Sequence, residues 1–255
     1  MSMEAGAYEP RRYRDSMAGP GLRCFTVSHL ESDLWVAVAA DAPPEAEEAA
    51  RTAMLEARRG LEEYIATDRE FLTALVPYEP RPGCPALARA MAAAAALAGV
   101  GPMAAVAGAV SAYVGRRLEE LFGLTEVIVE NGGDIYLRSN VPRRIAIYAG
   151  ASPLSNRLAL TLSPTLSPLG ICTSSGTVGH SLSFGRADAA TVLAKDAATA
   201  DAYATALGNH IQGPSDIDAA LSWIAASPEV LGAVVIAGDR VGAVGQVELG
   251  PYSGE

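Results

Sequence analysis

Apolar and polar positions along the chain follow two patterns, which predict strands and helices in an uneven order. Short apolar runs bounded by turn residues are typical of strands, and longer runs of helix formers are typical of helices. The pattern predicts strands over residues 22–27, 34–39, 126–130, 145–148, 158–162, 189–194, 233–237, 242–244 and 247–249. It predicts helices over residues 45–66, 86–98, 104–122, 199–207 and 217–226.

This order of elements predicts the fold class and the domain organisation. Strands and helices alternate irregularly, and several neighbouring strands are separated by hairpin-type turns. We therefore expect an α+β fold in which helices pack against a largely antiparallel or mixed sheet. Residues 1–20 are polar and interrupted by proline and glycine, so we expect them to form an N-terminal arm docked on a single domain spanning residues 21–255.

Two glycine-rich turns give sharper local predictions. The run Gly99-Val-Gly101-Pro-Met-Ala104 fits the letters of a dinucleotide-binding fingerprint, but a helix precedes it where that fingerprint needs a strand. We interpret it as a sharp helix-to-helix turn, with Pro102 at the start of the second helix. The run Asn131-Gly132-Gly133 is a hairpin-type turn, and we expect its glycines to need positive φ.

Composition narrows the functional classes. Half of the 255 residues are apolar, and the formal net charge is -10, so a general nucleic-acid surface is not expected. The three cysteines have no metal-type spacing, and the N-terminus lacks an apolar signal core, which together favour a reduced cytoplasmic location. The weakly polar stretch 85–115 is interrupted by Gly-Val-Gly-Pro, so we expect two buried helices there and no membrane span.

The stretch after Gly170 is the first candidate for chemistry. Within residues 170–185, four glycines alternate with six hydroxyl residues, and His180 lies among them. We expect a loop whose backbone N–H groups and hydroxyls form a concave surface for phosphate or another small anion. A Cys172 thiolate in such a loop would be stabilised by the donors, although the alternative is a small residue filling a strand end. The candidate ligand-binding residues here are Thr173, Ser174, Ser175, Gly176, Gly179 and Ser181.

A second candidate lies on the helix predicted at residues 199–207. Asp201 and Thr205 are four residues apart and share one helix face. A carboxylate and a hydroxyl one turn apart could hold a hard cation such as Mg²⁺, which keeps waters and shares substrate phosphates. The alternative is a solvated acid beside a hydroxyl. The sequence contains no P-loop, no nucleophile elbow and no H-E-x-x-H zinc motif.

Three segments in this order resemble one protein family. The string Glu130-Asn-Gly-Gly-Asp134-Ile, the small-residue stretch 101–108 and the string Ala200-Asp-Ala-Tyr-Ala-Thr-Ala-Leu207 are similar to motifs of the ApbE-like superfamily. Its best-known members are FAD:protein FMN transferases. The further string Thr173-Ser-Ser-Gly-Thr-Val-Gly-His-Ser-Leu-Ser-Phe-Gly resembles a shorter cytoplasmic branch. Some members of that branch are linked to sulfide assimilation into homocysteine.

The resemblance implies roles for particular residues. Asp201 and Thr205 match the residues that bind Mg²⁺ beside the FAD pyrophosphate. Gly132, Gly133 and Asp134 match a G-G-D turn near the flavin nucleotide. His180 resembles a histidine that could transfer a proton, but the residues after it are Ser-Leu-Ser-Phe-Gly-Arg, where the transferases have x-x-D-P-x-T-G.

Three functional hypotheses follow. The first is a cytoplasmic enzyme that binds a flavin or related nucleotide, with Mg²⁺ at Asp201 and Thr205 and with His180 and Cys172 as candidate catalytic residues. The second is an accessory or sulfur-handling protein in homocysteine biosynthesis, with sulfur-assimilation proteins as partners. The third is FMN transfer from FAD to a target protein. A second copy of the chain could pack on the alanine-rich helix pair. The first hypothesis requires the segment around His180, the G-G-D turn and Asp201 to meet at one open cleft.

Overall fold

The computed structural model describes residues 14, 19–178 and 183–252. These residues form an eight-stranded antiparallel sheet in the order β1-β2-β3-β4-β7-β8-β9-β10. Its strands are β1 (Leu22–His29), β2 (Ser32–Ala39), β3 (Val127–Asn131), β4 (Asp134–Arg138), β7 (Leu169–Ser174), β8 (Ala189–Ala194), β9 (Val230–Ala237) and β10 (Arg240–Gly245). A smaller antiparallel sheet contains β11 (Glu248–Pro251), β6 (Leu158–Leu162) and β5 (Arg143–Ala146).

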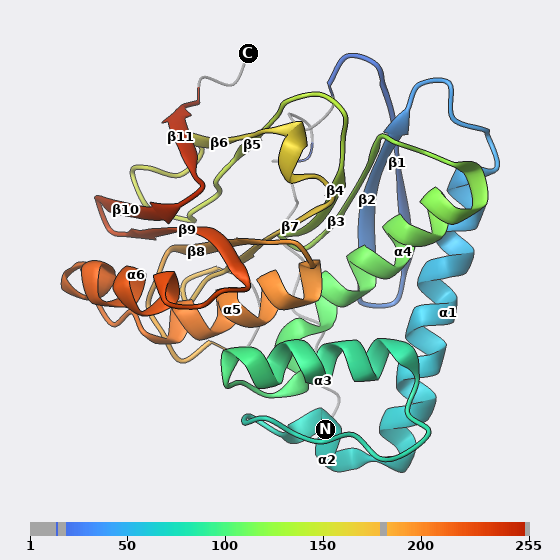
Figure 1. Ribbon diagram of the computed structural model, residues 1–255, viewed down its shortest axis with the longest axis horizontal. Helices are drawn as coiled ribbons and strands as arrows, with labels where there is room; N and C mark the ends of the chain where they lie inside the picture. Colours follow the sequence, from blue (N-terminus) through green and yellow to red (C-terminus); the bar gives the residue numbers. More distant parts are fainter. Residues whose placement is uncertain (1–13, 15–18, 179–182, 253–255) are drawn as a thin grey trace.

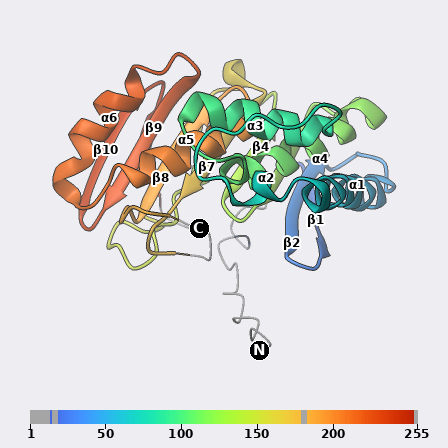
Figure 2. The same ribbon diagram turned by 90° about the horizontal axis from the view of Figure 1, so that it is seen from below.

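The helices cover one face of the large sheet, and the small sheet lies on the other face (Figure 1). The α-helices are α1 (Ala46–Thr67), α2 (Arg69–Thr73), α3 (Ala86–Ala98), α4 (Val106–Phe122), α5 (Ala197–Asn209) and α6 (Ile217–Ala225). Short 3-10 turns are η2 (Pro102–Ala105), η3 (Pro164–Leu166) and η4 (Pro214–Asp216). Figure 2 shows α1 at the β1–β2 end of the sheet and α6 at the β9–β10 end.

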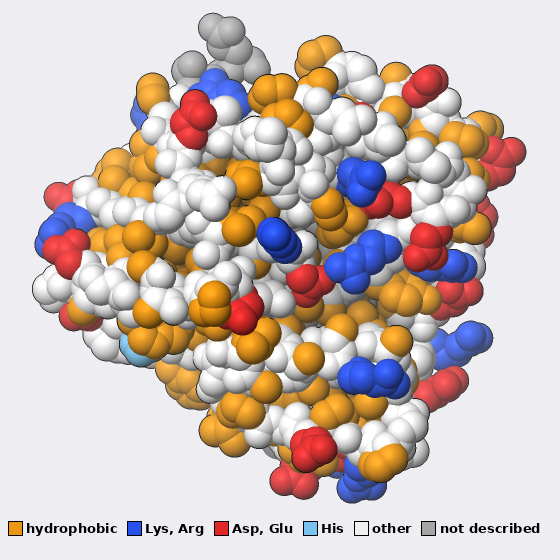
Figure 3. Space-filling model, in the orientation of Figure 1, with side chains coloured by type: hydrophobic (Ala, Val, Ile, Leu, Met, Phe, Trp, Pro, Cys, Tyr) orange, Lys and Arg blue, Asp and Glu red, His pale blue; other side chains and the backbone are white. Residues whose placement is uncertain are grey.

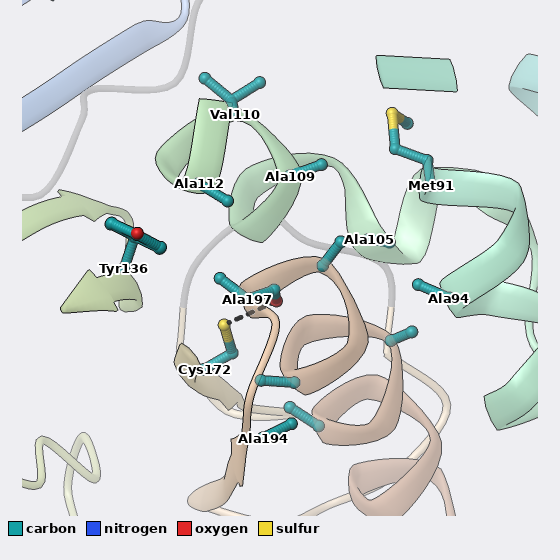
Figure 4. Close-up of a cluster of buried hydrophobic side chains, with 14 of the residues drawn as sticks. Met91, Ala94, Ala105, Ala109, Val110, Ala112, Tyr136, Cys172, Ala194 and Ala197 are labelled. Carbon is teal, nitrogen blue, oxygen red and sulfur yellow. Dashed lines mark hydrogen bonds between the residues drawn. The ribbon is translucent and has the colours of Figure 1, made fainter. Parts of the chain in front are cut away.

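The alternation of side chains along each strand produces two hydrophobic cores. In β4, Tyr136 faces the helices, whereas its neighbours Ile135 and Leu137 face the small sheet. Tyr136 fits because α4 has a glycine opposite it: a Cβ on Gly115 would lie 2.2 Å from the tyrosine ring. The ring lies beside Ala112 of the same helix (Figure 4). Small residues on α4 therefore allow a large aromatic side chain into the helix-side core.

The α+β fold predicted from the sequence is confirmed, including the largely antiparallel sheet. The predicted helix at Ala86–Ala98 and the strands at Leu158–Leu162 and Ala189–Ala194 have the observed bounds. The helix-to-helix turn is also confirmed, because Gly99 has a φ of 75° at the end of α3 and Pro102 is the first residue of η2. The 3-10 turn delays the start of α4 to Val106, two residues later than expected.

One prediction about the fold is wrong, because the segment from Gly170 to Ser174 belongs to strand β7 and not to a loop. The strand was missed because its small and polar residues do not show an apolar pattern. Gly170 is explained by packing between elements: a Cβ there would lie 2.4 Å from the Cα of Ala197, so only glycine lets α5 approach the strand. This close contact places the start of α5 directly on β7.

The Gly132-Gly133 turn is a two-residue hairpin loop, as predicted. Asn131 and Asp134 are directly paired across β3 and β4. The φ angles of Gly132 and Gly133 are 68° and 103°, a region that favours glycine strongly. The turn therefore fixes the start of β4 and, with it, the position of the Asp134 backbone.

A Gly133→Val variant is expected to yield either no soluble protein or a protein that melts at lower temperature and no longer binds ligand. A branched side chain at this φ adds strain of roughly 1–3 kcal/mol. Thermal unfolding is the measurement. Gly213→Val is the matched control, because Gly213 has an extended φ of -169° and open space around its Cβ position. Equal melting temperatures for the two variants would contradict the prediction.

Among the described residues, no single helix has both the length and the apolar character needed to cross a membrane. Only α3 taken together with η2 and α4 would meet these criteria, and that pair is bent by 103° at its break.

Candidate functional site

Asp201 lies on α5 and caps the first turn of a different helix, α4. Its Oδ2 accepts a hydrogen bond of 2.8 Å from the Gly108 N–H, and the Ala107 N–H also donates to the carboxylate. These amides belong to the first turn of α4, where N–H groups have no partner inside the helix and the helix dipole is positive. Asp201 is only 8% exposed. The alternative of a solvated acid is therefore wrong.

Burial dominates the electrostatics of Asp201. Loss of hydration raises the pKa of its carboxyl group to about 7, while the hydrogen bonds from Gly108 and Ala107 lower the pKa and limit the rise. The group therefore changes charge close to neutral pH.

Asp134 is a second buried carboxyl group at the same place. It is 9% exposed, and burial first, then the charges of Asp201 and Glu130, raise its pKa well above the ordinary range. Contacts from the Cys172 thiol and the Thr173 backbone oppose this rise. Its Oδ1 atom has no hydrogen-bond partner within the described part of the chain. We refer to Asp134 and Asp201 as the carboxyl pair.

Four elements bring the carboxyl pair together. Asp134 is paired with Cys172 across β4 and β7. The Cys172 thiol donates to the carbonyl oxygen of Ala197, the first residue of α5, at 3.3 Å (Figure 4). Asp201 follows one helical turn later on α5. From α4, the Ser111 hydroxyl donates to the backbone oxygen of Asp134 at 2.9 Å. Contacts between β4, β7, α4 and α5 thus fix both acids.

Gly108 belongs to the site, although the sequence motifs did not predict a role for it there. A Cβ at this position would lie 2.2 Å from the Ala197 carbonyl oxygen and 2.8 Å from the Cβ of Asp201. Glycine therefore lets the first turn of α4 come close enough to donate to Asp201. The signal in the sequence was its place at the end of the small-residue stretch 101–108.

Cys172 does not have the surroundings that the sequence analysis expected. It lies in β7 and is fully buried. Burial first, and then the charges of Asp134 and Asp201, raise the pKa of its thiol well above the ordinary value. The expectation of a thiolate stabilised by loop donors is therefore wrong, and the alternative of a small residue in a strand is the observed one. A neutral buried thiol is poorly suited to nucleophilic catalysis.

Thr205 lies one turn after Asp201 on α5 and is half-buried. The spacing of four residues places the two side chains on one face of the helix. The hydroxyl is thus on the side of α5 that presents Asp201.

Strand β7 contains the first residues of the predicted donor loop, up to Ser174. Alternation along β7 sends the side chains of Thr173 and Ser174 to opposite faces of the sheet. The Thr173 hydroxyl contacts the Thr191 hydroxyl on β8 at 2.9 Å. These two hydroxyls therefore do not form one concave surface, and that expectation is wrong for them.

Residues after β7 form hydrogen bonds and close contacts within the protein. The Ser175 hydroxyl oxygen accepts from the backbone N–H groups of Thr177 and Val178 at 3.1 and 3.0 Å. A Cβ on Gly176 would lie 2.0 Å from the carbonyl oxygen of Gly185, so the glycine is explained by close packing of the chain on itself. The other predicted residues of this segment, Gly179, His180 and Ser181, lie outside the described residues.

The G-G-D turn is held by a residue that the sequence analysis did not single out. The Gly133 N–H donates to Oε1 of Glu130 at 2.7 Å, and Glu130 is fully buried. Its Oε2 accepts from the Arg14 guanidinium at 2.6 Å. Arg14 also contacts Asp33 on β2 at 2.9 Å. Contacts between residues this far apart in the chain are visible only in the fold.

The G-G-D turn and Asp201 meet as expected. Their carboxyl groups are 9% and 8% exposed, so among the described residues the site is nearly closed, and the segment around His180 that the hypothesis also places there lies outside those residues. On the face shown in Figure 3, basic and acidic side chains are interspersed with hydrophobic ones. This distribution and the net charge of -10 differ from the basic surface that binding to a nucleic-acid backbone requires. The candidate site itself consists of buried carboxyl groups beside backbone N–H donors.

A match to a known protein family covers most of the chain. A family model described as "AbpE bacteria" matches residues 15–237. The chain belongs to this family. The resemblance to the ApbE-like superfamily inferred from the G-G-D turn and the Asp201 helix is thereby confirmed.

Three relatives show how similar this chain is to other members. A UPF0280 protein of Methanothrix thermoacetophila is 45% identical over 201 residues, covering 78% of this chain and 84% of the relative. Those of Methanosphaerula palustris and Methanoculleus marisnigri are 48% and 50% identical, covering 78% and 76% of this chain and 82% and 78% of the relatives.

Two solved structures share the fold of this ApbE-like protein. The flavin transferase ApbE from Vibrio cholerae has a TM-score of 0.59 at 13% identity, covering 91% of this chain and 97% of its own. The Pseudomonas stutzeri flavinyl transferase ApbE, in its apo form, has a TM-score of 0.55 at 17% identity, covering 88% and 93%. At these identities the similarity shows the fold alone.

Proposed function

We propose that this ApbE-like protein binds a divalent cation together with a flavin nucleotide such as FAD. Asp134 and Asp201 of the carboxyl pair and the hydroxyl of Thr205 would hold the cation. The observation that carries the proposal is the buried Oδ1 of Asp134, which has no hydrogen-bond partner among the described residues and lies beside a second buried carboxyl group.

The argument is one of charge balance. Within the described chain, no Lys or Arg side chain forms an ion pair with Asp134 or Asp201. Two adjacent buried carboxyl groups require neutralisation by protons or by a cation, since an unpaired buried charge is costly. Mg²⁺ prefers oxygen ligands, accepts one or two carboxylates, and completes its shell with water and substrate phosphates. The donor set fits this ion.

The nucleotide is proposed from the fold and from the same charge argument. A bound Mg²⁺ would attract the pyrophosphate of FAD and neutralise its negative charge. Gly132 is exposed at the end of the hairpin, two residues before Asp134, so the turn offers backbone atoms to a ligand that contacts the cation. The structural neighbours named as flavin transferases favour a flavin nucleotide over other pyrophosphates.

The test is a titration of purified protein with FAD, followed by flavin fluorescence, with Mg²⁺ or with EDTA. We expect Mg²⁺ to strengthen FAD binding at least about tenfold, which corresponds to a coupling free energy of about 1.4 kcal/mol between the two ligands. Asp201→Asn and Thr205→Val are expected to abolish the Mg²⁺ effect. Asp216→Asn, which changes an acid in η4, is the matched control and should retain it. Absence of binding at millimolar FAD would reject the proposal.

A second candidate function is transfer of FMN from FAD to an acceptor protein, which the named activity of the structural neighbours favours. In this reaction the acceptor oxygen forms a bond to the FMN phosphorus, the pyrophosphate bond breaks, and AMP leaves. His180 stays the predicted proton-transfer residue. Incubation with FAD and an acceptor, followed by mass spectrometry, decides between transfer and binding. An acceptor of unchanged mass with no AMP released excludes transfer to it.

The sulfur-handling alternative loses the motivation that came from Cys172. Cys172 in a loop was one of its three motivations, beside the changed residues after His180 and the association of the branch, and the observed thiol is buried in β7 with a raised pKa. We therefore do not propose that role for the site.

A further inference from the structure

The side of α5 that carries Asp201 and Thr205 continues to Asn209, the last residue of the helix. Residues four apart lie on one side of a helix, and the rise of 1.5 Å per residue places the Cα of Asn209 about 12 Å from that of Asp201. Strand β7 runs beside this end of the helix, because a Cβ on Gly208 would lie 3.5 Å from the Ser174 hydroxyl oxygen. Asp201 and Asn209 therefore lie along one side of α5, two turns apart.

The end of α5 holds the backbone of Phe184. The Asn209 Oδ1 accepts a hydrogen bond from the Phe184 N–H at 2.9 Å, and the Gln212 side-chain amide donates to the Phe184 carbonyl oxygen at 3.0 Å. The next residue is also fixed, since a Cβ on Gly185 would lie 1.8 Å from the carbonyl oxygen of Gly208. Two side-chain amides and a close backbone contact thus anchor the main chain of Phe184.

The Phe184 side chain, in contrast, is 59% exposed. Among the residues that the structure describes, no aromatic ring or cation packs on it. A single exposed apolar side chain is ordinary on a protein surface. A ring whose backbone is already fixed, however, has less conformational entropy to lose when a ligand binds. Such a side chain is suited to stacking on a planar ring.

We propose that Phe184 stacks on the planar heteroaromatic ring of the nucleotide whose pyrophosphate contacts the cation at Asp201 and Thr205. This inference rests on the proposed function and adds the residue that binds the ring. In an extended nucleotide, a sugar or ribityl chain separates the ring from the phosphates. The two turns of α5 between Asp201 and Asn209 provide a separation of the same kind.

The test compares ligands that have a ring with one that has none. In the presence of Mg²⁺, Phe184→Ala is expected to bind FAD at least about tenfold more weakly than wild type, because stacking on an aromatic side chain contributes a factor of this order. Its binding of inorganic pyrophosphate with Mg²⁺, measured by calorimetry, is expected to be unchanged. The ratio of FAD affinities in Mg²⁺ and in EDTA should equal that of wild type, since the proposed cation ligands are intact.

Titrations with FMN and with ADP identify which ring of FAD is bound. A loss of affinity in Phe184→Ala for FMN assigns the isoalloxazine ring, and a loss for ADP assigns the adenine ring. Phe184→Trp keeps an aromatic surface and is expected to retain FAD binding. Retention in Phe184→Trp together with loss in Phe184→Ala attributes the effect to the ring of the side chain.

Two further variants test the anchoring and provide the control. Asn209→Ala removes the acceptor of the Phe184 N–H and is expected to weaken FAD binding, whereas the double variant Phe184→Ala/Asn209→Ala should bind no more weakly than Phe184→Ala alone. Leu121→Ala is the matched control, because Leu121 is also exposed, at 53%, but lies about 20 Å along α4 from Gly108. It should leave the binding of every ligand unchanged.

Failure of this inference is distinguishable from failure of the proposed function. Equal FAD binding by wild type and Phe184→Ala would overturn the role of Phe184 and leave the proposed function in place. An equal loss of FAD and of pyrophosphate binding in Phe184→Ala would also overturn it, because such a loss means general damage to the cation site. Absence of FAD binding by wild type at millimolar ligand would reject the proposed function, and this inference with it.

Discussion

Replacing Asp201 with asparagine is expected to stabilise the metal-free protein at pH 8 and to remove its response to Mg²⁺. Burial raises the pKa of Asp201 to about 7, above the ordinary aspartate value of about 3.9. With 1.36 kcal/mol for each pH unit, the cost of ionising the folded protein has an upper limit of about 4 kcal/mol. Asparagine avoids this cost and keeps an oxygen that can accept from the Gly108 N–H.

The sign of the pH dependence follows from the raised pKa. A folded protein that holds the proton more tightly than the unfolded chain is most stable below the unfolded pKa. That stability is lost as pH rises through the folded pKa, so wild type in EDTA should become less stable between about pH 4 and pH 7. Asp201→Asn should show a flatter profile and a melting temperature higher by several degrees at pH 8.

Thermal unfolding in EDTA from pH 5 to pH 8 checks this prediction. Asp216→Asn is the control, because the pKa of Asp216 is shifted in the opposite direction: hydrogen bonds from the Gln212 and Gly213 backbones lower it. Removing that carboxylate should not stabilise the protein at pH 8. A lower melting temperature for Asp201→Asn than for wild type in EDTA would show that the carboxylate is structural.

Gly108→Ala is expected to be strongly destabilising, although alanine is normally the better helix residue. Its Cβ would lie 2.2 Å from the Ala197 carbonyl oxygen and 2.8 Å from the Asp201 Cβ. Both atoms are fixed by α5, so α4 and α5 must move apart. Overpacking of this kind costs typically about 1–3 kcal/mol or more. The movement also withdraws the N–H groups that hold Asp201, so Mg²⁺-dependent ligand binding should be lost.

Gly60→Ala in α1 is the matched control. Gly60 is also a helical glycine, but nothing lies within 4 Å of its Cβ position. Alanine is expected to stabilise there by roughly 0.5–1 kcal/mol through helix propensity. Urea denaturation of both variants measures the difference. Equal stability of Gly108→Ala and Gly60→Ala would mean that the helices separate without cost.

Local patterns predicted the fold well where a segment is apolar and periodic, as in α3 and β8. They failed in β7, because the small and polar residues around Gly170 and Cys172 form a strand only through packing of α5 and pairing with β4 and β8. The positive φ of the Gly132-Gly133 turn could be expected from residue type alone.

The site was accessible from the sequence in part. Asp201 was identified from its spacing of four residues to Thr205 as well as from the resemblance to a family, whereas Asp134 was identified through the resemblance alone. Their burial, and the resulting rise in pKa, depends on helices and strands that no local pattern describes. Glu130 and Arg14 were missed as a pair, since nothing in either local sequence indicates a partner 116 residues away.

The most direct test is the position of the cation. Crystals of the protein grown with FAD and Mn²⁺, measured for anomalous scattering of manganese, would place the ion without reference to activity. We expect one strong peak within about 2.5 Å of a carboxylate oxygen of Asp201, with Asp134 and Thr205 beside it and the flavin pyrophosphate in contact. Bound flavin with the ion at other residues, or with no ion at Asp201, would contradict the account.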